Sequence, residues 1–284
     1  MAFISYAQNF EDVILWRALS DVENGFYIDV GAADPEEDSV TRAFYDRGWS
    51  GINVEPLDEY FQKLQQARPR DRNLKVALGR EAGLRTLHAF AGTGLSTLNP
   101  QIGARHKAAG LQAHEIVVPV LTLGKVLEDC TAPTIHFLKI DAEGSEKEVL
   151  EGMNLDRTRP WIILVEATEP LSGVSSRSSW ELLVTSRGYS FAYFDGLNCF
   201  YISDETPGLK ARLAIPPNPF DDFVRWPELL YRQKVVELQD ALREEQAQNA
   251  NLNIALQAEK NHSANLQNIL QAEQAQKRQP QHLH

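Results

Sequence analysis

Up to residue 202, short runs of apolar residues alternate with segments whose apolar residues recur at helical spacing. The runs are rich in β-branched and aromatic residues, which predicts strands at residues 26–30, 51–55, 74–78, 134–140 and 161–165, and a closing hairpin at 189–194 and 199–202. Between them, the spacing predicts helices at residues 5–19, 39–48, 57–68, 121–127 and 180–186. The alternation predicts an α/β protein with a mostly parallel seven-stranded sheet.

The turn after the first strand is typical of a nucleoside-binding edge. Asp29 and Gly31 end that strand, Asp34 follows in the turn, and Glu55 ends the second strand. Ligands of open α/β sheets lie at the carboxyl ends of the strands, where Gly31 permits close backbone approach and an acid such as Glu55 accepts both ribose hydroxyls. We therefore expect Asp29, Gly31, Asp34 and Glu55 to bind a nucleoside cofactor.

The number of glycines decides which cofactor this turn suits. Dinucleotide enzymes use G-x-G-x-x-G to hold a pyrophosphate, whereas this turn has the single glycine Gly31. Asp29 and Asp34 would repel a pyrophosphate but attract the cationic sulfonium and amino group of S-adenosylmethionine. The turn therefore favours S-adenosylmethionine over NAD. The alternative is a βαβ turn that binds no ligand.

Several motifs in a fixed order give the chain a resemblance to a known family. It resembles the FkbM-type methyltransferases, which implies an S-adenosylmethionine-dependent O-methyltransferase with the Rossmann-like class I fold. The resemblance spans residues 5 to about 224. The matching segments are Tyr6-Ala7-Gln8-Asn9-Phe10-Glu11-Asp12, residues 26–35, 49–56 and 94–98, Phe137 to Glu146, residues 160–168 and 193–201.

The resemblance adds further cofactor candidates. In the family pattern Gln8 and Glu11 belong to a motif that precedes the first strand, and we expect this segment to close over the cofactor. The alternative is a polar turn that only caps the first helix. The loop after the third strand of class I methyltransferases touches adenine, which makes Ala77 a candidate. Ser39, at the predicted N-cap of the helix at 39–48, completes the set.

Three acids at strand ends are the catalytic candidates. Methyl transfer to a hydroxyl depends on positioning, and the hydroxyl must also lose a proton. Asp141 and Glu143 follow the fourth strand, and Glu166 follows the fifth. Oxygen ligands also suit Mg²⁺, so the same three residues are candidate metal ligands, an arrangement similar to metal-assisted O-methyltransferases of the catechol type. The alternatives are substrate contacts or capping of the helix near Ser145, and Lys139 is placed to pair with one of the acids.

Residues 80–120 depart from the βαβ alternation. Two segments of strand character, 86–90 and 115–120, flank a glycine-rich loop and a polar helical stretch. Such insertions commonly determine substrate choice. Ser96 and Thr97 are therefore candidate substrate contacts, and the alternative is that they only form turns.

Composition limits the partners. The net charge of −11 and the absence of a basic patch argue against nucleic acid and favour a neutral or weakly charged acceptor. Cys130 and Cys199 lie far apart in the sequence and form neither a metal motif nor a disulfide framework. Both are expected to be free thiols in a reducing compartment. The sequence shows no signal-peptide pattern and no transmembrane segment, so we expect a soluble cytoplasmic protein.

The acceptor is the least determined part of the function. FkbM-like enzymes act on hydroxyls of glycans and polyketides, and the aromatic residues Trp49, Tyr193 and Phe194 suit packing on sugar rings. We therefore expect a small-molecule or glycan acceptor, such as a sugar of a surface polysaccharide. The alternatives are a polyketide-type metabolite, a methyltransferase-fold adaptor without turnover, or an NAD-dependent sugar-modifying enzyme.

The C-terminal part has a different composition. Residues 235–273 carry a 14-residue repeat, with the leucine pairs Leu238/Leu242, Leu252/Leu256 and Leu266/Leu270 at heptad a and d positions. Polar residues interrupt the remaining heptad positions. The pattern predicts a methyltransferase domain at 1–226, a weak coiled coil at 227–279 that holds a second copy or a partner protein, and a disordered tail at 280–284. The alternative for the tail is a single solvated helix.

Overall fold

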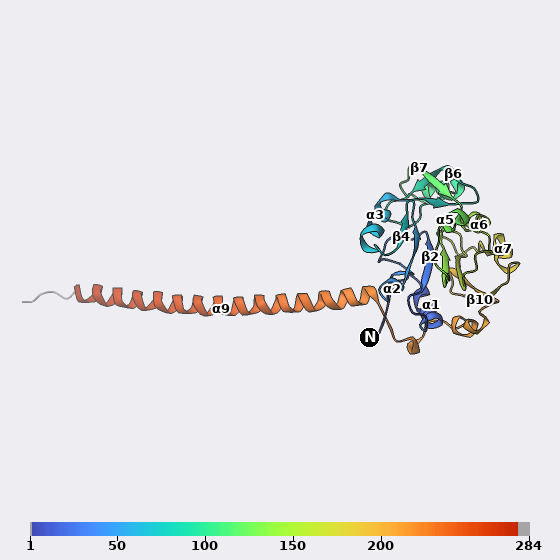
Figure 1. Cartoon of the computed structure of the whole chain (residues 1–284). Coiled ribbons are helices and arrows are strands. Elements are labelled where there is room, and N and C mark those ends of the chain that lie inside the picture. Colours follow the sequence, from blue (N-terminus) through green and yellow to red (C-terminus); the bar gives the residue numbers. More distant parts are fainter. Residues whose placement is uncertain (1, 278–284) are drawn as a thin grey trace, which may run out of the picture. The chain divides into compact units, whose positions relative to one another are not determined.

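The computed structural model describes residues 2–277. The chain forms two compact units, one ending at Trp226 and one beginning at Pro227. The first unit contains the sheets of the described chain, and the second consists of helix α9 (Trp226–Lys277) beyond its first residue (Figure 1).

The main sheet has seven strands and is mixed. The strand β11 runs antiparallel to both of its neighbours, and the other pairings are parallel. The order across the sheet is β10 (Tyr189–Phe194), β11 (Asn198–Ser203), β9 (Ile162–Glu166), β8 (Phe137–Ile140), β2 (Phe26–Val30), β3 (Ser50–Val54) and β4 (Arg72–Leu74). Six of these strands correspond to predicted strands, including the antiparallel hairpin, whereas β4 shares only Leu74 with the strand predicted at 74–78.

Helices cover both faces of this sheet, which explains why its central strands are continuously apolar. One core cluster packs the sheet against α5 (Leu123–Leu127), α6 (Glu146–Glu151) and α7 (Glu181–Thr185). The second packs the other face against α1 (Glu11–Leu19), α2 (Arg42–Tyr45) and α8 (Lys210–Leu213). Helix α3 (Asp58–Ala67) lies next to β4, and short 3₁₀ turns occupy Arg177–Ser179, Pro207–Leu209 and Pro219–Asp221.

Two smaller sheets complete the first unit. The insertion at residues 80–120 supplies β6 (Gly83–Ala89) and β7 (His114–Leu121), which are labelled in Figure 1. They form a three-stranded sheet in the order β5 (Ala77–Leu78), β7, β6, and helix α4 (Pro100–Ala108) lies between β6 and β7 in the chain. The side chain of Asn99 caps α4 by accepting the backbone N–H groups of Gln101 and Ile102. Strand β1 (Phe3–Ser5) pairs in parallel with β12 (Phe223–Arg225).

Three predicted elements differ in the structure. The helix predicted at 5–19 begins only at Glu11, because residues 3–5 pair with β12. The helix predicted at 39–48 is limited to Arg42–Tyr45, because Ser39 and Thr41 are held in the preceding loop by Arg68 and Asp29. The strand predicted at 74–78 is split between two sheets.

Helix α9 is a single helix of 52 residues whose heptad leucines are exposed to solvent. The disordered tail predicted at 280–284 lies outside the described residues. Within residues 2–277, no helix combines the length and apolar character needed to cross a membrane.

Candidate active site

A cavity of about 560 Å³ opens at the carboxyl ends of β2, β3, β8 and β9. The loop of residues 92–96 from the insertion and residues 197–198 of the β10–β11 turn also line it. The wall is strongly acidic: it contains Glu11, Asp34, Glu37, Asp38, Glu55, Glu59, Asp141, Glu143 and Glu166 but only two cationic residues, Lys63 and Lys139. The carboxyl groups of this wall that are ionised attract cations and repel anionic ligands.

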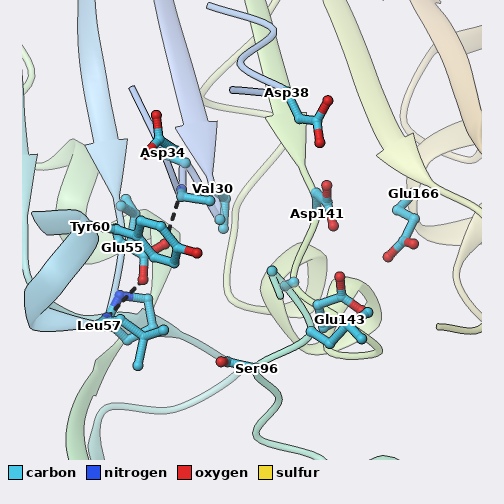
Figure 2. Close-up of a pocket in the computed structure, with 18 of the residues that line it drawn as sticks. Val30, Asp34, Asp38, Glu55, Leu57, Tyr60, Ser96, Asp141, Glu143 and Glu166 are labelled. Atoms are coloured by element: carbon cyan, nitrogen blue, oxygen red, sulfur yellow. Dashed lines mark hydrogen bonds between the residues drawn. The ribbon is translucent and has the colours of Figure 1, made fainter. Parts of the chain in front are cut away.

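Glu55 lies at the end of the cavity next to β3. Its Oε2 accepts the backbone N–H of Ala33 at 3.0 Å and its Oε1 accepts that of Leu57 at 2.7 Å. These bonds fix the carboxylate on the cavity wall, and each oxygen keeps capacity for a further hydrogen bond. Burial raises the pKa of Glu55 to about 7. Tyr60 of α3 lines the same end of the cavity, as Figure 2 shows.

The turn after β2 approaches the turn after β8 very closely. Gly31 has a φ of +73°, and a Cβ on it would lie 1.8 Å from the carbonyl oxygen of Asp141. The packing of the two turns therefore requires a glycine at position 31.

Asp34 lies in the same turn as Gly31. Its carboxylate accepts hydrogen bonds from the backbone N–H of Glu36 and from the ammonium of Lys63. Burial opposes ionisation of this carboxyl group, but these bonds lower the pKa of Asp34.

Asp141, Glu143 and Glu166 converge at the other end of the cavity. One carboxylate oxygen from each lies within 4.8 Å of the others. Oε2 of Glu143 and Oε2 of Glu166 are buried without a hydrogen-bond partner. Burial, followed by the charge of Asp141, raises the pKa of Glu143 to about 9 and that of Glu166 to about 11. The structure therefore brings the three predicted catalytic acids together at one end of the cavity.

Lys139 stands between the two ends of the cavity. Its ammonium donates to the carbonyl oxygen of Gly31 at 2.8 Å, and lies 3.3 Å from Asp29 and 3.4 Å from Asp141. Burial opposes its charge, but the neighbouring carboxylates of Asp29 and Asp141 raise the pKa of Lys139. The lysine therefore links the turn after β2 to the turn after β8 through these contacts.

The N-terminal segment is tied to the turn between β10 and β11. Glu11 accepts the N–H of Asn9 and the side-chain amide of Asn198, each at 2.8 Å. Burial and then the charge of Asp195 raise the pKa of Glu11 to about 8. Gln8, Glu11 and Asn198 all line the cavity, so this segment forms one of its walls.

Some predicted site residues do not line the cavity. Asp29 is buried and accepts a hydrogen bond from the hydroxyl of Thr41. Ser39 is also buried, and its hydroxyl accepts a hydrogen bond from the guanidinium of Arg68. Thr97 is also buried and bonds the backbone of Glu143. The cavity does bring together Gln8, Glu11, Gly31, Asp34, Glu55, Ala77, Ser96, Asp141, Glu143 and Glu166.

The aromatic residues chosen for a sugar platform lie elsewhere. Trp49 is in the hydrophobic core against Phe44, and Tyr193 and Phe194 belong to β10 outside the cavity. Among the residues that line the cavity, Tyr60 is the one aromatic side chain. The prediction that Trp49 packs on a sugar is therefore wrong, and Tyr193 and Phe194 do not line this cavity.

Lys139, Tyr60 and Asn198 reach the cavity although sequence reasoning did not select them as site residues. The period of two along a strand places Lys139 on the same face as Asp141, which was the available signal. Tyr60 follows the strand-end Glu55 by five residues. The contact of Asn198 with Glu11 joins distant parts of the chain, so no local pattern indicates it.

The strand order places the key residues in a row. Glu55 follows β3, Gly31 follows β2, Asp141 follows β8 and Glu166 ends β9, and these four strands are neighbours in that order. Figure 2 shows Glu55 on one side of the cavity, Glu166 on the other, and Asp141 and Glu143 between them. The strand order of the seven-stranded mixed sheet, with its antiparallel strand β11 next to one edge, is that of a methyltransferase-like α/β fold.

Comparison with known proteins identifies the family. The sequence model of the methyltransferase FkbM domain matches residues 29–191, and the chain belongs to this family. No curated protein shows a significant match.

Two crystal structures show a distant likeness to the chain. The methyltransferase FkbM from Methylobacillus flagellatus is 15% identical with a TM-score of 0.40, and the match covers 63% of this chain and 43% of that protein. A TehB-like SAM-dependent methyltransferase from Corynebacterium glutamicum is 8% identical with a TM-score of 0.38, and the match covers 68% of this chain and 87% of that protein. Both likenesses are too remote to carry a functional conclusion.

Proposed function

We propose that the protein is an S-adenosylmethionine-dependent O-methyltransferase of the class I type. The observation that carries this proposal is the row of Glu55, Gly31, Asp141 and Glu166 along one edge of the sheet. The ribose binds at Glu55, and the sulfonium lies toward Asp141, where the acidic wall favours a positive charge. The volume of about 560 Å³ lies within the range of sites that hold small molecules.

Bound S-adenosylmethionine supplies an activated methyl group on its sulfonium. The residues of this chain align the acceptor hydroxyl and take its proton. During methyl transfer the acceptor hydroxyl gives its proton to Asp141, whose carboxylate lies 3.4 Å from the ammonium of Lys139. Glu143 and Glu166 line the same end of the cavity, where they hold the acceptor by hydrogen bonds.

A second candidate mechanism uses a divalent cation. Asp141, Glu143 and Glu166 offer three oxygen ligands within 4.8 Å, which suits a hard ion such as Mg²⁺. The ion would acidify the acceptor hydroxyl, which would reduce the need for a base.

The acceptor we propose is a sugar without anionic groups, such as a unit of a surface polysaccharide. Several carboxyl groups at one end of the cavity provide partners for several hydroxyls, and the acidic wall disfavours phosphates and uronates. A polyketide-type metabolite and an adaptor without turnover are the alternatives.

Methyl transfer to a panel of acceptors tests this function. The panel holds methyl glycosides of neutral hexoses, of amino sugars and of uronic acids, together with hydroxylated polyketides, and transfer is followed with labelled S-adenosylmethionine. We expect uptake by the neutral or amino sugars and none by the uronic acids. Uptake only by a polyketide would refute the sugar assignment, and cofactor binding without any uptake would favour the adaptor.

We also propose that the domain boundary lies at residues 226–227 and that the following helix assembles the protein. The leucine pairs of α9 recur every 14 residues, but Glu245, Asn249, Glu259 and Ser263 occupy other heptad positions. These polar residues would weaken a coiled-coil seam. We expect a weak, concentration-dependent contact with a second copy or with a partner protein.

A further inference from the structure

Thr97 lies between β6 and α4, and its side chain is buried outside the cavity. Its hydroxyl donates to the carbonyl oxygen of Glu143 at 2.7 Å and accepts the backbone N–H of Asn99 at 3.0 Å. The backbone of Thr97 also exchanges two hydrogen bonds with His88 of β6. The hydroxyl is therefore engaged with the protein and is fixed by the insertion.

Glu143 has an uncommon backbone conformation. Its φ of +48° lies in the left-handed region, which a residue with a side chain adopts only when its surroundings hold it there. Oε1 of Glu146 accepts the N–H groups of Ala142 and Gly144 on either side of it. Thr97 binds the carbonyl oxygen of Glu143 itself.

The insertion also packs against this turn. A Cβ on Gly144 would lie 2.1 Å from Cδ1 of Ile102 in α4, so helix and turn are in direct contact. Arg85 of β6 pairs with Glu148 of α6, and Arg105 of α4 pairs with Glu169 at 2.6 Å. The segment that lines the cavity with residues 92–96 is thus fastened to the turn that carries Glu143.

We propose that Thr97 is a positioning residue that aims the Glu143 carboxyl into the acceptor end of the cavity. This role rests on the proposed function, because it assumes that Glu143 engages the acceptor. The insertion then has two tasks, since it forms part of the acceptor wall and also orients a group that holds the acceptor.

Hydrogen exchange tests the positioning without any acceptor. Thr97→Val keeps the shape of the side chain and removes both hydrogen bonds of the hydroxyl. We expect amide exchange in the 141–146 segment to be roughly tenfold faster than in the wild type, with Thr97→Ser close to the wild type. Thr185→Val, which removes a comparable hydroxyl-to-carbonyl bond in α7, is the matched control and leaves this segment unchanged. Unchanged exchange in Thr97→Val overturns the positioning role.

A kinetic double-mutant cycle tests whether Thr97 acts through Glu143. With methyl glycosides of neutral hexoses as acceptors, Thr97→Val lowers kcat by roughly 10- to 100-fold with unchanged cofactor affinity. In the Glu143→Gln background the same change lowers kcat by less than about threefold. Equal effects in both backgrounds overturn the inference alone. Wild-type turnover by Glu143→Gln overturns the proposed role of Glu143, while the exchange measurement still decides whether Thr97 holds the turn.

Discussion

Gly31 and Asp141 are so close that no side chain fits between them: a Cβ on Gly31 would lie 1.8 Å from the Asp141 carbonyl oxygen. Gly31→Ala therefore forces the two turns apart. Gly110 is the matched control, because its φ is +93° and an added Cβ meets no atom within 4 Å. We expect Gly110→Ala to cost about 1 kcal/mol of unfolding free energy and Gly31→Ala a further 1–3 kcal/mol or so. Denaturant titration measures both, and equal losses would contradict the close packing.

The stability of the protein is expected to depend on pH through Glu11. Burial and the charge of Asp195 raise the pKa of Glu11 from 4.5 to about 8. The folded state then binds the proton of Glu11 more tightly than the unfolded chain does. The stability that this proton contributes to the folded state is complete below pH 4.5 and is lost as the pH rises through 8. The melting temperature should fall over that range, and less steeply in Glu11→Gln. Burial raises the pKa of Asp12 to about 6, so the melting temperature of Glu11→Gln still depends on pH through Asp12. Identical slopes would show that Glu11 does not titrate in this way.

The role of Asp141 can be separated from cofactor binding. Asp141→Asn should abolish turnover, because proton transfer occurs only in the transition state. It should leave S-adenosylmethionine affinity nearly intact, because the other acids of the wall still face the bound cofactor. Treatment with EDTA distinguishes base from metal ligand: activity that survives it rules out an exchangeable metal ion. Full activity in Asp141→Asn would rule out both roles.

The assembly of the protein is expected to depend on α9. Leu252 and Leu256 are exposed heptad leucines, whereas Ile254 is an exposed apolar residue between them on another face of the helix. Replacing Leu252 and Leu256 with Asp should reduce self-association as much as removing residues 228–284 does, because charge is costly to bury in a seam. Ile254→Asp is the control and should leave assembly unchanged. Light scattering at several concentrations measures this, and an unchanged oligomer after truncation would place the contact in the first unit.

The sequence predicted the strands of the main sheet better than its helices. Continuously apolar strands such as β9 give a local signal, because both of their faces are buried. The helix predicted at 39–48 failed because the contacts of Ser39 with Arg68 and of Thr41 with Asp29 depend on the folded chain. Long-range contacts of this kind override local propensity.

The same distinction holds for the candidate site. Strand-end acids such as Glu55 and Glu166 were predictable, because the topology places strand ends at one edge. The contact between Glu11 and Asn198 and the burial of Thr97 depend on how distant loops pack, which no spacing encodes. The aromatic residue Trp49 was misplaced because an aromatic side chain serves a core as readily as a ligand surface.

The central claim is that Glu55 marks the ribose end of a cofactor site. Calorimetric titration of the full chain with S-adenosylmethionine tests it most directly, using the wild type, Glu55→Gln and Glu55→Ala. We expect the wild type to bind at one site and Glu55→Ala to lose about 1–2 kcal/mol of binding free energy, or more, since charge-assisted hydrogen bonds to the ribose are removed. Glu55→Gln, which keeps one acceptor oxygen, should lose less. Wild-type affinity in Glu55→Ala, or no binding by the wild type, would contradict the account.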